Sequence, residues 1–259
     1  MNLPMDHPLL NVLNQHQSVR AYRSDPVPEE MLESILHAAM RSATSSNLQM
    51  GSVVVVREDA RRHALATLCG DQRHIREAPV FLAWCADRNR LDRVCALQGM
   101  SQDTEWVESF LVAAVDAAIM MQSATIAAEA LGLGCCYIGA IRNNPEEVIG
   151  VLELPAHVFP IAGMTLGYGV QSPGEAPLRP RLSLDTFVHY ERYRTVSDDE
   201  LHRYDRVMQE TGIYRGRKMA GSSLPEEEYG WLEHSALRVR QESRKTLRGV
   251  LEHQGFPLR

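Results

Sequence analysis

The sequence predicts an α/β or layered α+β domain, and three kinds of segment indicate it. Short apolar runs typical of buried strands occur at residues 53–56, 80–86 and 157–169. Helical patterns lie between or before them, at residues 29–41, 60–68 and 107–131. Strands that alternate with helices in this way are typical of a sheet covered by helices.

The helix predicted at residues 107–131 is the most apolar stretch of the chain. Its apolar residues fill nearly every face, so we expect it to be buried nearly all round. Asp116 and Glu129 interrupt the run, and the uncharged piece at 117–128 is shorter than the roughly 18 residues that span a bilayer. We therefore interpret it as a core helix of a soluble protein, and its many alanines make it a candidate for packing against its own copy.

A glycine-rich turn follows this helix. Gly132 and Gly134 are predicted to supply positive φ angles that end it, before a short buried strand at residues 135–138. The strand ends at Gly139 and leads into another helix, with Asn144 as N-cap and Pro145 at the first position. Backbone N–H groups near Gly139 would be free to face a ligand, although a plain strand-to-helix turn explains the pattern equally well.

Composition excludes several classes of protein. A formal net charge of −6 and a pI near 5.9 argue against a nucleic-acid-binding protein. The five cysteines lack C-x-x-C spacing, so neither a metal site nor a disulfide framework is predicted. The first residues lack the pattern of a signal peptide, and a cytoplasmic protein is expected.

Three polar segments share one chemistry. In an extended segment, His16, Ser18 and Arg20 point to the same side, as an anionic ligand requires, although a solvated polar edge would show the same pattern. The hydroxyl-rich tract at residues 42–49 is predicted to be a loop. A proline-rich loop at 174–182 carries two more arginines. Together the segments indicate a site for a phosphorylated ligand that forms many hydrogen bonds.

The composition changes after residue 190. Charged residues number 25 among the last 69 positions and 35 among the first 190. Helical periodicity at 200–210 and 233–253, with a loop at 211–229, predicts a helical excursion. We expect a core at residues 1–190 and an extension at 191–259 that wraps the core within one structural domain.

Six motifs occur in a fixed order along the chain: HQSVR at 16–20, TSSNLQ at 44–49, GDQRH at 70–74, AAEALGLG at 127–134, YIGAIRNN at 137–144 and RPRL at 179–182. With these motifs the chain resembles the flavin-dependent nitroreductases, in particular the NADPH-preferring group of oxygen-insensitive nitroreductases and flavin reductases. The resemblance covers nearly the whole chain.

The resemblance implies an FMN-binding homodimer of α+β fold, with a mixed sheet flanked by helices, protomers joined in a domain-swapped manner and a C-terminal helical excursion. It implies a flavin cleft made by both subunits. It also implies ping-pong transfer of electron pairs from NADPH to nitroaromatics, quinones or related acceptors. No metal and no catalytic protein residue is implied, since the flavin carries the chemistry.

Residue roles also follow from the resemblance. His16, Ser18, Arg179 and Arg181 are similar to phosphate ligands of the family, and Arg20 to the cation beside flavin N1 and the C2 carbonyl. The expected contacts to the ribityl chain and the pyrimidine edge are Thr44, Ser45, Asn47 and Gln72. The turn expected to face flavin N5 comprises Gly139, Ala140 and Ile141. Val19 and Arg142 complete the expected cofactor-binding set.

The sequence departs from the family pattern at three positions. Gln17 stands where the group often has Arg, and Arg179 stands where Lys is usual, which keeps the charge but changes its geometry. Ala140 replaces a common second glycine, and its Cβ limits the conformations of the turn.

The donor site is expected at the basic cluster of residues 214–218. The resembling group has an NADPH-selecting Arg before a Gly here, and Arg215 matches it. A solvated basic loop balanced by the acidic residues 226–228 is the alternative. Two other functions stay open at this stage: a flavin reductase that supplies free reduced FMN, and a flavin-binding protein without turnover. The sequence distinguishes neither the physiological acceptor nor the strictness of the NADPH preference.

Overall fold

The computed structural model describes residues 6–171 and 177–259, and these form two compact units. The core unit lies within Met1–Ala176 and Arg244–Arg259, and the second unit is Pro177–Ser243. Residues 174–176 of the predicted proline-rich loop lie outside the described residues. The boundary predicted at residue 190 from composition stays a prediction.

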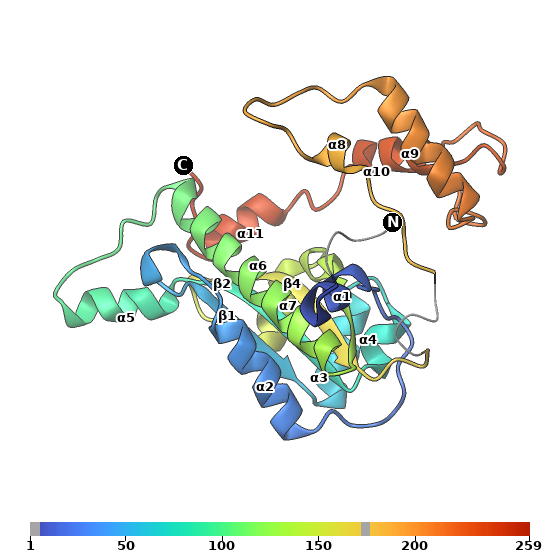
Figure 1. Cartoon of the computed structure of the whole chain (residues 1–259). Coiled ribbons are helices and arrows are strands. Elements are labelled where there is room, and N and C mark those ends of the chain that lie inside the picture. The colour runs from blue at the N-terminus through green and yellow to red at the C-terminus, as the bar shows by residue number, and fades with distance from the viewer. Residues whose placement is uncertain (1–5, 172–176) are drawn as a thin grey trace. The chain divides into compact units, whose positions relative to one another are not determined.

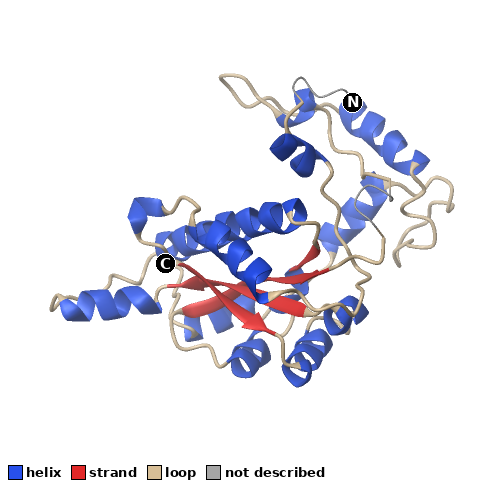
Figure 2. Cartoon of the chain, turned by 60° about the horizontal axis from the view of Figure 1, so that its bottom comes forward, coloured by secondary structure: helices blue, strands red, loops and turns tan. Residues whose placement is uncertain are grey.

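A four-stranded sheet in the order β1-β2-β4-β3 forms the centre of the core unit, with helices on both of its faces (Figure 2). Its strands are β1 (Gly51–Val56), β2 (Val80–Asp87), β3 (Gly134–Ile138) and β4 (Val158–Gly167). All pairings of these strands are antiparallel, and an isolated bridge between Ser18 and Cys135 is parallel. The predicted strands and the α+β class are confirmed.

The described residues of the core unit contain eight α-helices and two 3-10 turns. The helices are α1 (Pro8–Asn14), α2 (Glu29–Met40), α3 (Asp59–Leu68), α4 (Arg73–Glu77), α5 (Asn89–Leu97), α6 (Val107–Ala130), α7 (Pro145–Leu152) and α11 (Leu247–His253). The turns are η1 (Ser45–Asn47) and η2 (Gly139–Arg142). The second unit holds α8 (Leu184–Phe187), α9 (Asp198–Glu210) and α10 (Trp231–Arg240).

Each face of the sheet has its own hydrophobic cluster. On one face, α2 and α6 lie beside each other over the sheet, where Ile35, Ala124 and Met164 belong to one cluster (Figure 1). On the other face, Leu65 of α3 and Val148 of α7 pack with Phe81 of β2. Because β2 is buried along almost its whole length, it reads as a continuous apolar run rather than an alternating one.

Helix α6 differs from the expectation of all-round burial. By length and composition it could cross a membrane, but its residues Ala117, Ala124 and Ala128 are buried within the core. The opposite stripe stays exposed within one chain: Val107, Leu111, Val115 and Ile119 are 51%, 54%, 46% and 40% exposed. These residues recur every four positions and therefore form one continuous apolar face.

Three predicted elements need correction. Residues 69–74 are not only a turn, because α4 begins at Arg73 after Gly70 and Asp71 take positive φ angles. The helix predicted at 233–253 is two helices, α10 and α11, separated by residues 241–246 with Arg244 at a φ of 54°. Asn144 does occupy the N-cap of α7, but its side chain donates to the Leu68 carbonyl instead of capping the helix.

Asp116 is the one charged group of α6 that is fully buried, at 1% exposure. Its carboxylate accepts backbone N–H bonds from Ser45 at 3.1 Å and from Met50 at 2.9 Å. Two otherwise unpaired donors of the hydroxyl loop are thereby satisfied. The charge that interrupts the apolar pattern in the sequence thus ties this loop to the core.

We expect Asp116→Asn to lower the free energy of unfolding by about 1–3 kcal/mol, because an amide group accepts only one of the two N–H bonds and faces the other donor with its own NH₂. Urea denaturation measures the change. The control is Asp199→Asn, which removes the same charge from an exposed position of α9. Equal stability of the two variants would contradict an anchoring role for Asp116.

Candidate functional site

The segment at residues 18–22 lies across one end of strands β3 and β4. The Val19 N–H donates to the Cys135 carbonyl at 2.9 Å, and Tyr22 forms a bridge with Gly169. The Tyr22 hydroxyl also donates to the Val19 carbonyl at 2.8 Å, and burial raises the pKa of this hydroxyl far above its usual value. These bonds hold Ser18 and Arg20 at the edge of the sheet.

Gly134 has a different role from the one predicted. It lies in β3 and does not adopt a positive φ, whereas Gly132 does, at 78°. A Cβ at Gly134 would lie 2.4 Å from Val19 Cγ2. The glycine is therefore needed for the close approach of the segment at 18–22 to the strand.

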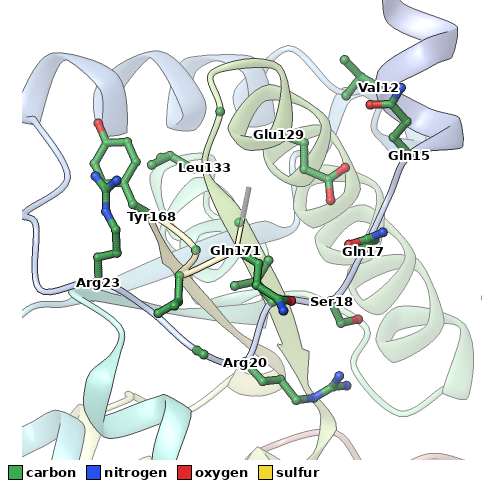
Figure 3. A pocket seen from close by; sticks show the side chains of 16 residues that line it. Val12, Gln15, Gln17, Ser18, Arg20, Arg23, Glu129, Leu133, Tyr168 and Gln171 are labelled. Atoms are coloured by element: carbon green, nitrogen blue, oxygen red, sulfur yellow. The ribbon is translucent and has the colours of Figure 1, made fainter. Parts of the chain in front are cut away.

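A cavity of about 630 Å³ opens beside this segment (Figure 3). Of the predicted cofactor-binding residues, Ser18, Val19 and Arg20 line it. Arg23 stacks over the ring of Tyr168 at 5.1 Å, while Arg20 points away from this pair (Figure 3). The Ser18 hydroxyl and the Arg20 guanidinium form no hydrogen bond within residues 6–171 and 177–259. Unpaired donors beside a cavity suit an anionic ligand.

His16 lies next to the same cavity. Its Nδ1 atom is 2.6 Å from Oε1 of Glu129, which comes from the last turn of α6 and lines the cavity. Arg20 also acts on the turn at 70–74, because burial and, second, the charge of Arg20 lower the pKa of His74. The structure therefore brings residues 16–20 and the turn at 70–74 into one neighbourhood.

The hydroxyl loop lies elsewhere on α6. Thr44 precedes η1, and Ser46 and Asn47 take positive φ angles of 49° and 56°. Ser45 is tied to Asp116, whereas His16 is tied to Glu129. These two carboxylates are 13 helical residues apart, a rise of about 20 Å along α6. Within one chain the structure does not bring Thr44, Ser45 and Asn47 together with His16, Ser18 and Arg20.

The turns at 69–72 and 139–144 lie side by side. The Gln72 side chain donates to the Cys69 carbonyl at 2.7 Å, and the Asn144 side chain donates to the Leu68 carbonyl at 2.7 Å. The buried His74 Nε2 has no partner among the described residues. Gln72 and Gly139 are thus on neighbouring turns, as the predicted site requires.

Turn η2 is held by two arginines. Arg244 donates to the Gly139 carbonyl at 2.9 Å and to the Asn143 side chain at 3.2 Å, and Arg142 donates to the Ile161 carbonyl. Burial, and then the charge of Arg244, lower the pKa of Arg142. Ala140 adopts no positive φ, so its Cβ causes no strain in this turn. Sequence reasoning missed Arg244 because it placed that residue inside a continuous helix.

The second unit carries the remaining predicted residues. Arg181 donates to the Arg179 carbonyl at 3.2 Å, and the Tyr204 hydroxyl donates to the Pro180 carbonyl at 3.1 Å. Arg215 lines a separate cavity of about 330 Å³ with Tyr214, Tyr229, Glu226 and Glu227. Glu226 accepts the Gly216 N–H at 2.5 Å. The acidic residues therefore lie at the basic cluster, as the solvated-loop alternative expects.

Three of the buried cysteines, Cys69, Cys85 and Cys135, are unsuited to nucleophilic chemistry. Burial raises the pKa of Cys69, Cys85 and Cys135 to about 12, so each is a neutral thiol at physiological pH. Within the described residues no group of three or more His, Cys, Asp or Glu side chains is arranged to hold a metal ion. The polar groups that line the cavity at residues 16–20 include the Ser18 hydroxyl, the Arg20 guanidinium and the Glu129 carboxylate.

Residues 13–168 match the nitroreductase family, and residues 179–259 match its C-terminal domain. The chain belongs to the nitroreductase family. A solved structure of NfrA2 from B. megaterium superimposes with a TM-score of 0.90 at 32% identity, covering 98% of this chain and 100% of that one. The resemblance inferred from the six motifs and the predicted fold class are both confirmed.

Two relatives of nearly equal length have named activities. An oxygen-insensitive NADPH nitroreductase from Salmonella typhimurium is 35% identical over 254 residues, 97% of this chain and 99% of that protein. An FMN reductase (NAD(P)H) from Bacillus subtilis is 36% identical over 256 residues, 96% of this chain and 97% of that protein. The structure of an NADPH:FMN oxidoreductase from Vibrio harveyi, complexed with NAD+, has a TM-score of 0.85 at 29% identity, covering 98% and 100% of the two chains.

In this nitroreductase, we expect Gly134→Ala to lower the free energy of unfolding by about 1–3 kcal/mol, because the new methyl group overlaps the side chain of Val19. Val19→Ala removes both methyl groups but keeps Val19 Cβ, which would lie 2.7 Å from the new methyl carbon, so the double variant Val19→Ala/Gly134→Ala relieves part of the overlap. Chemical denaturation should therefore find the double variant more stable than Gly134→Ala alone. A double variant that is less stable would show that the two residues do not constrain each other.

Proposed function

We propose that this nitroreductase is an FMN-dependent NADPH oxidoreductase that reduces nitroaromatics, quinones or related small-molecule acceptors by ping-pong transfer of electron pairs. The main support is that this chain matches an NADPH nitroreductase and an FMN reductase over nearly its full length and theirs. The unpaired Ser18 and Arg20 donors beside the 630 Å³ cavity fit a mononucleotide. Bound FMN would supply the redox chemistry.

The residues of the chain then have binding and tuning roles. His16 and Ser18 are proposed to hold the phosphate through hydrogen bonds, and Arg179 and Arg181 keep the phosphate-binding role that their resemblance to the family implies. Arg20 is proposed to stabilise negative charge at the pyrimidine edge of the ring, where a fixed cation favours the reduced form. The N–H groups of η2, which Arg244 holds through the Gly139 carbonyl, are proposed to face N5 of the ring.

Thr44, Ser45, Asn47 and Gln72 are proposed as ribityl and pyrimidine-edge contacts, and Val19, Ala140, Ile141 and Arg142 complete the set. Because the hydroxyl loop and residues 16–20 attach to α6 about 20 Å apart, one chain does not provide both groups at one place. A homodimer in which each chain supplies one group to each site accounts for this separation. We also infer a cytoplasmic location, since the buried cysteines Cys69, Cys85 and Cys135 form no disulfide.

The function is tested by releasing the cofactor from purified protein with heat and by mixing the intact protein with NADPH without oxygen. The proposal expects FMN in the supernatant and bleaching of the yellow protein, followed by recovery of colour with a quinone or a nitroaromatic. A colourless protein after reconstitution with FMN, or FAD as the released cofactor, would overturn it. A yellow protein that NADPH leaves unchanged would indicate a flavin-binding protein without turnover.

A flavin reductase is the second candidate, favoured by the 36% identity to the Bacillus subtilis FMN reductase. It would release reduced FMN to another protein rather than reduce an acceptor in its own cleft. Steady-state rates with free FMN and with a quinone at matched concentrations distinguish the two functions. A kcat/KM that is higher for free FMN would favour the reductase.

We expect the exposed stripe of α6 to form part of the dimer interface, since four large apolar side chains on one helix face are costly to leave in water. Ile119→Glu should convert the dimer into a monomer in sedimentation velocity at micromolar concentration. The control Val55→Glu introduces the same charge at a residue of similar exposure on β1, 37% against 40%. A wild-type monomer that retains FMN would refute the dimer.

We expect Arg215→Ala to raise the KM for NADPH about 10- to 150-fold. This range corresponds to the loss of one charge-assisted contact to the 2′-phosphate, which contributes roughly 1.5–3 kcal/mol. The KM for NADH and the FMN content should stay unchanged, because NADH lacks this phosphate. Initial-rate kinetics with both donors measure the effect. Equal changes with both donors would indicate a folding defect, and no change would place the donor site elsewhere.

A further inference from the structure

Glu129 is a carboxylate at a place where the proposed function calls for positive charge. It lines the same cavity as Ser18 and Arg20, and its side chain is only 14% exposed. In Figure 3 it reaches from α6 toward the segment that carries Gln17 and Ser18. A carboxylate beside a phosphate site weakens anion binding by repulsion unless another group uses its charge.

His16 is the group that uses this charge. Its Nδ1 lies 2.6 Å from Glu129 Oε1, across 113 positions of sequence, so the contact joins the N-terminal segment to the end of α6. Glu129 as a carboxylate only accepts, so the Nδ1 atom carries the proton of this bond. The second ring nitrogen, Nε2, forms no hydrogen bond with residues 6–171 or 177–259, and the His16 side chain is 34% exposed.

A histidine that donates from both ring nitrogens is a cation. If Nδ1–H is held by Glu129, then Nε2 can donate to a phosphate oxygen only in this doubly protonated form. A carboxylate bound to Nδ1 fixes the orientation of the ring and leaves Nε2 for a ligand. His16 would then lie between the Glu129 carboxylate and the phosphate and bind both, which offsets the repulsion between the two anions.

We propose that Glu129 is a positioning residue for the phosphate end of the cofactor, which acts by holding the ring of His16 through Nδ1 so that Nε2 is left to bind the phosphate. The inference rests on the proposed function, because it names the partner that makes His16 a phosphate ligand. Glu129 is inferred to act through His16 and not through a contact of its own with the ligand. Its effect is therefore confined to the phosphate and leaves the ring system alone.

The proposal is tested with FMN and riboflavin, which differ only in the phosphate. Each flavin is titrated into apoprotein, and its dissociation constant is measured from the quenching of flavin fluorescence. Glu129→Gln keeps the size and an acceptor oxygen but removes the charge. We expect this variant to weaken FMN binding about 10-fold, the loss of one charge-assisted interaction, and riboflavin binding less than about 2-fold. Glu108→Gln, at an exposed position of the same helix, controls for the change in net charge and should alter neither affinity.

The His16→Ala background makes the test specific. If Glu129 acts through His16, then adding Glu129→Gln to His16→Ala should not weaken FMN binding further, whereas Glu129→Asp in the wild-type background should retain part of the phosphate selectivity. Equal losses for FMN and riboflavin would show a merely structural role. Tighter FMN binding by Glu129→Gln would show that the carboxylate only repels the phosphate. Wild-type protein that binds neither flavin would overturn the proposed function itself.

Discussion

Two carboxylates on one apolar helix determine where the candidate site is built. Asp116 binds the backbone of the hydroxyl loop, and Glu129 binds the ring of His16. Because α6 is rigid and packs on the sheet through its alanine face, the distance between these anchors is set by the rise of the helix. The two groups of predicted cofactor ligands are therefore held apart within a chain, however either loop moves.

The same helix also supports the proposed homodimer. One face is made of small residues that allow close packing against α2 and the sheet, and the other carries large apolar residues that stay 40–54% exposed. A partner on that face would bury the stripe and would bring a second hydroxyl loop with it. In the proposed homodimer, dimerisation and completion of the site would be one event.

The sequence predicted the strands and most helices because their apolar runs are long and buried on both faces of the sheet, as in β2 and α6. It could not predict features set by contacts distant in sequence. Gly134 must be a glycine because the side chain of Val19 packs against it, and the charge of Asp116 is needed because it binds the backbone of a loop. Arg244 lies in the segment between α10 and α11, which the helical spacing of Leu247 and Leu251 conceals in the sequence. The motifs predicted which residue types form the site. The separation of the hydroxyl loop from residues 16–20 along α6 could be seen only in the three-dimensional structure.

Subunit complementation tests most directly whether each site is built from two chains. One inactive variant carries Arg20→Ala and Ser18→Ala, the other carries Thr44→Ala and Asn47→Ala, and the two are unfolded, mixed in equal amounts and refolded together. Random pairing makes half of the dimers mixed, each with one intact site, so about a quarter of the wild-type NADPH-dependent activity should return. Activity no higher than that of the two variants refolded separately would contradict the account.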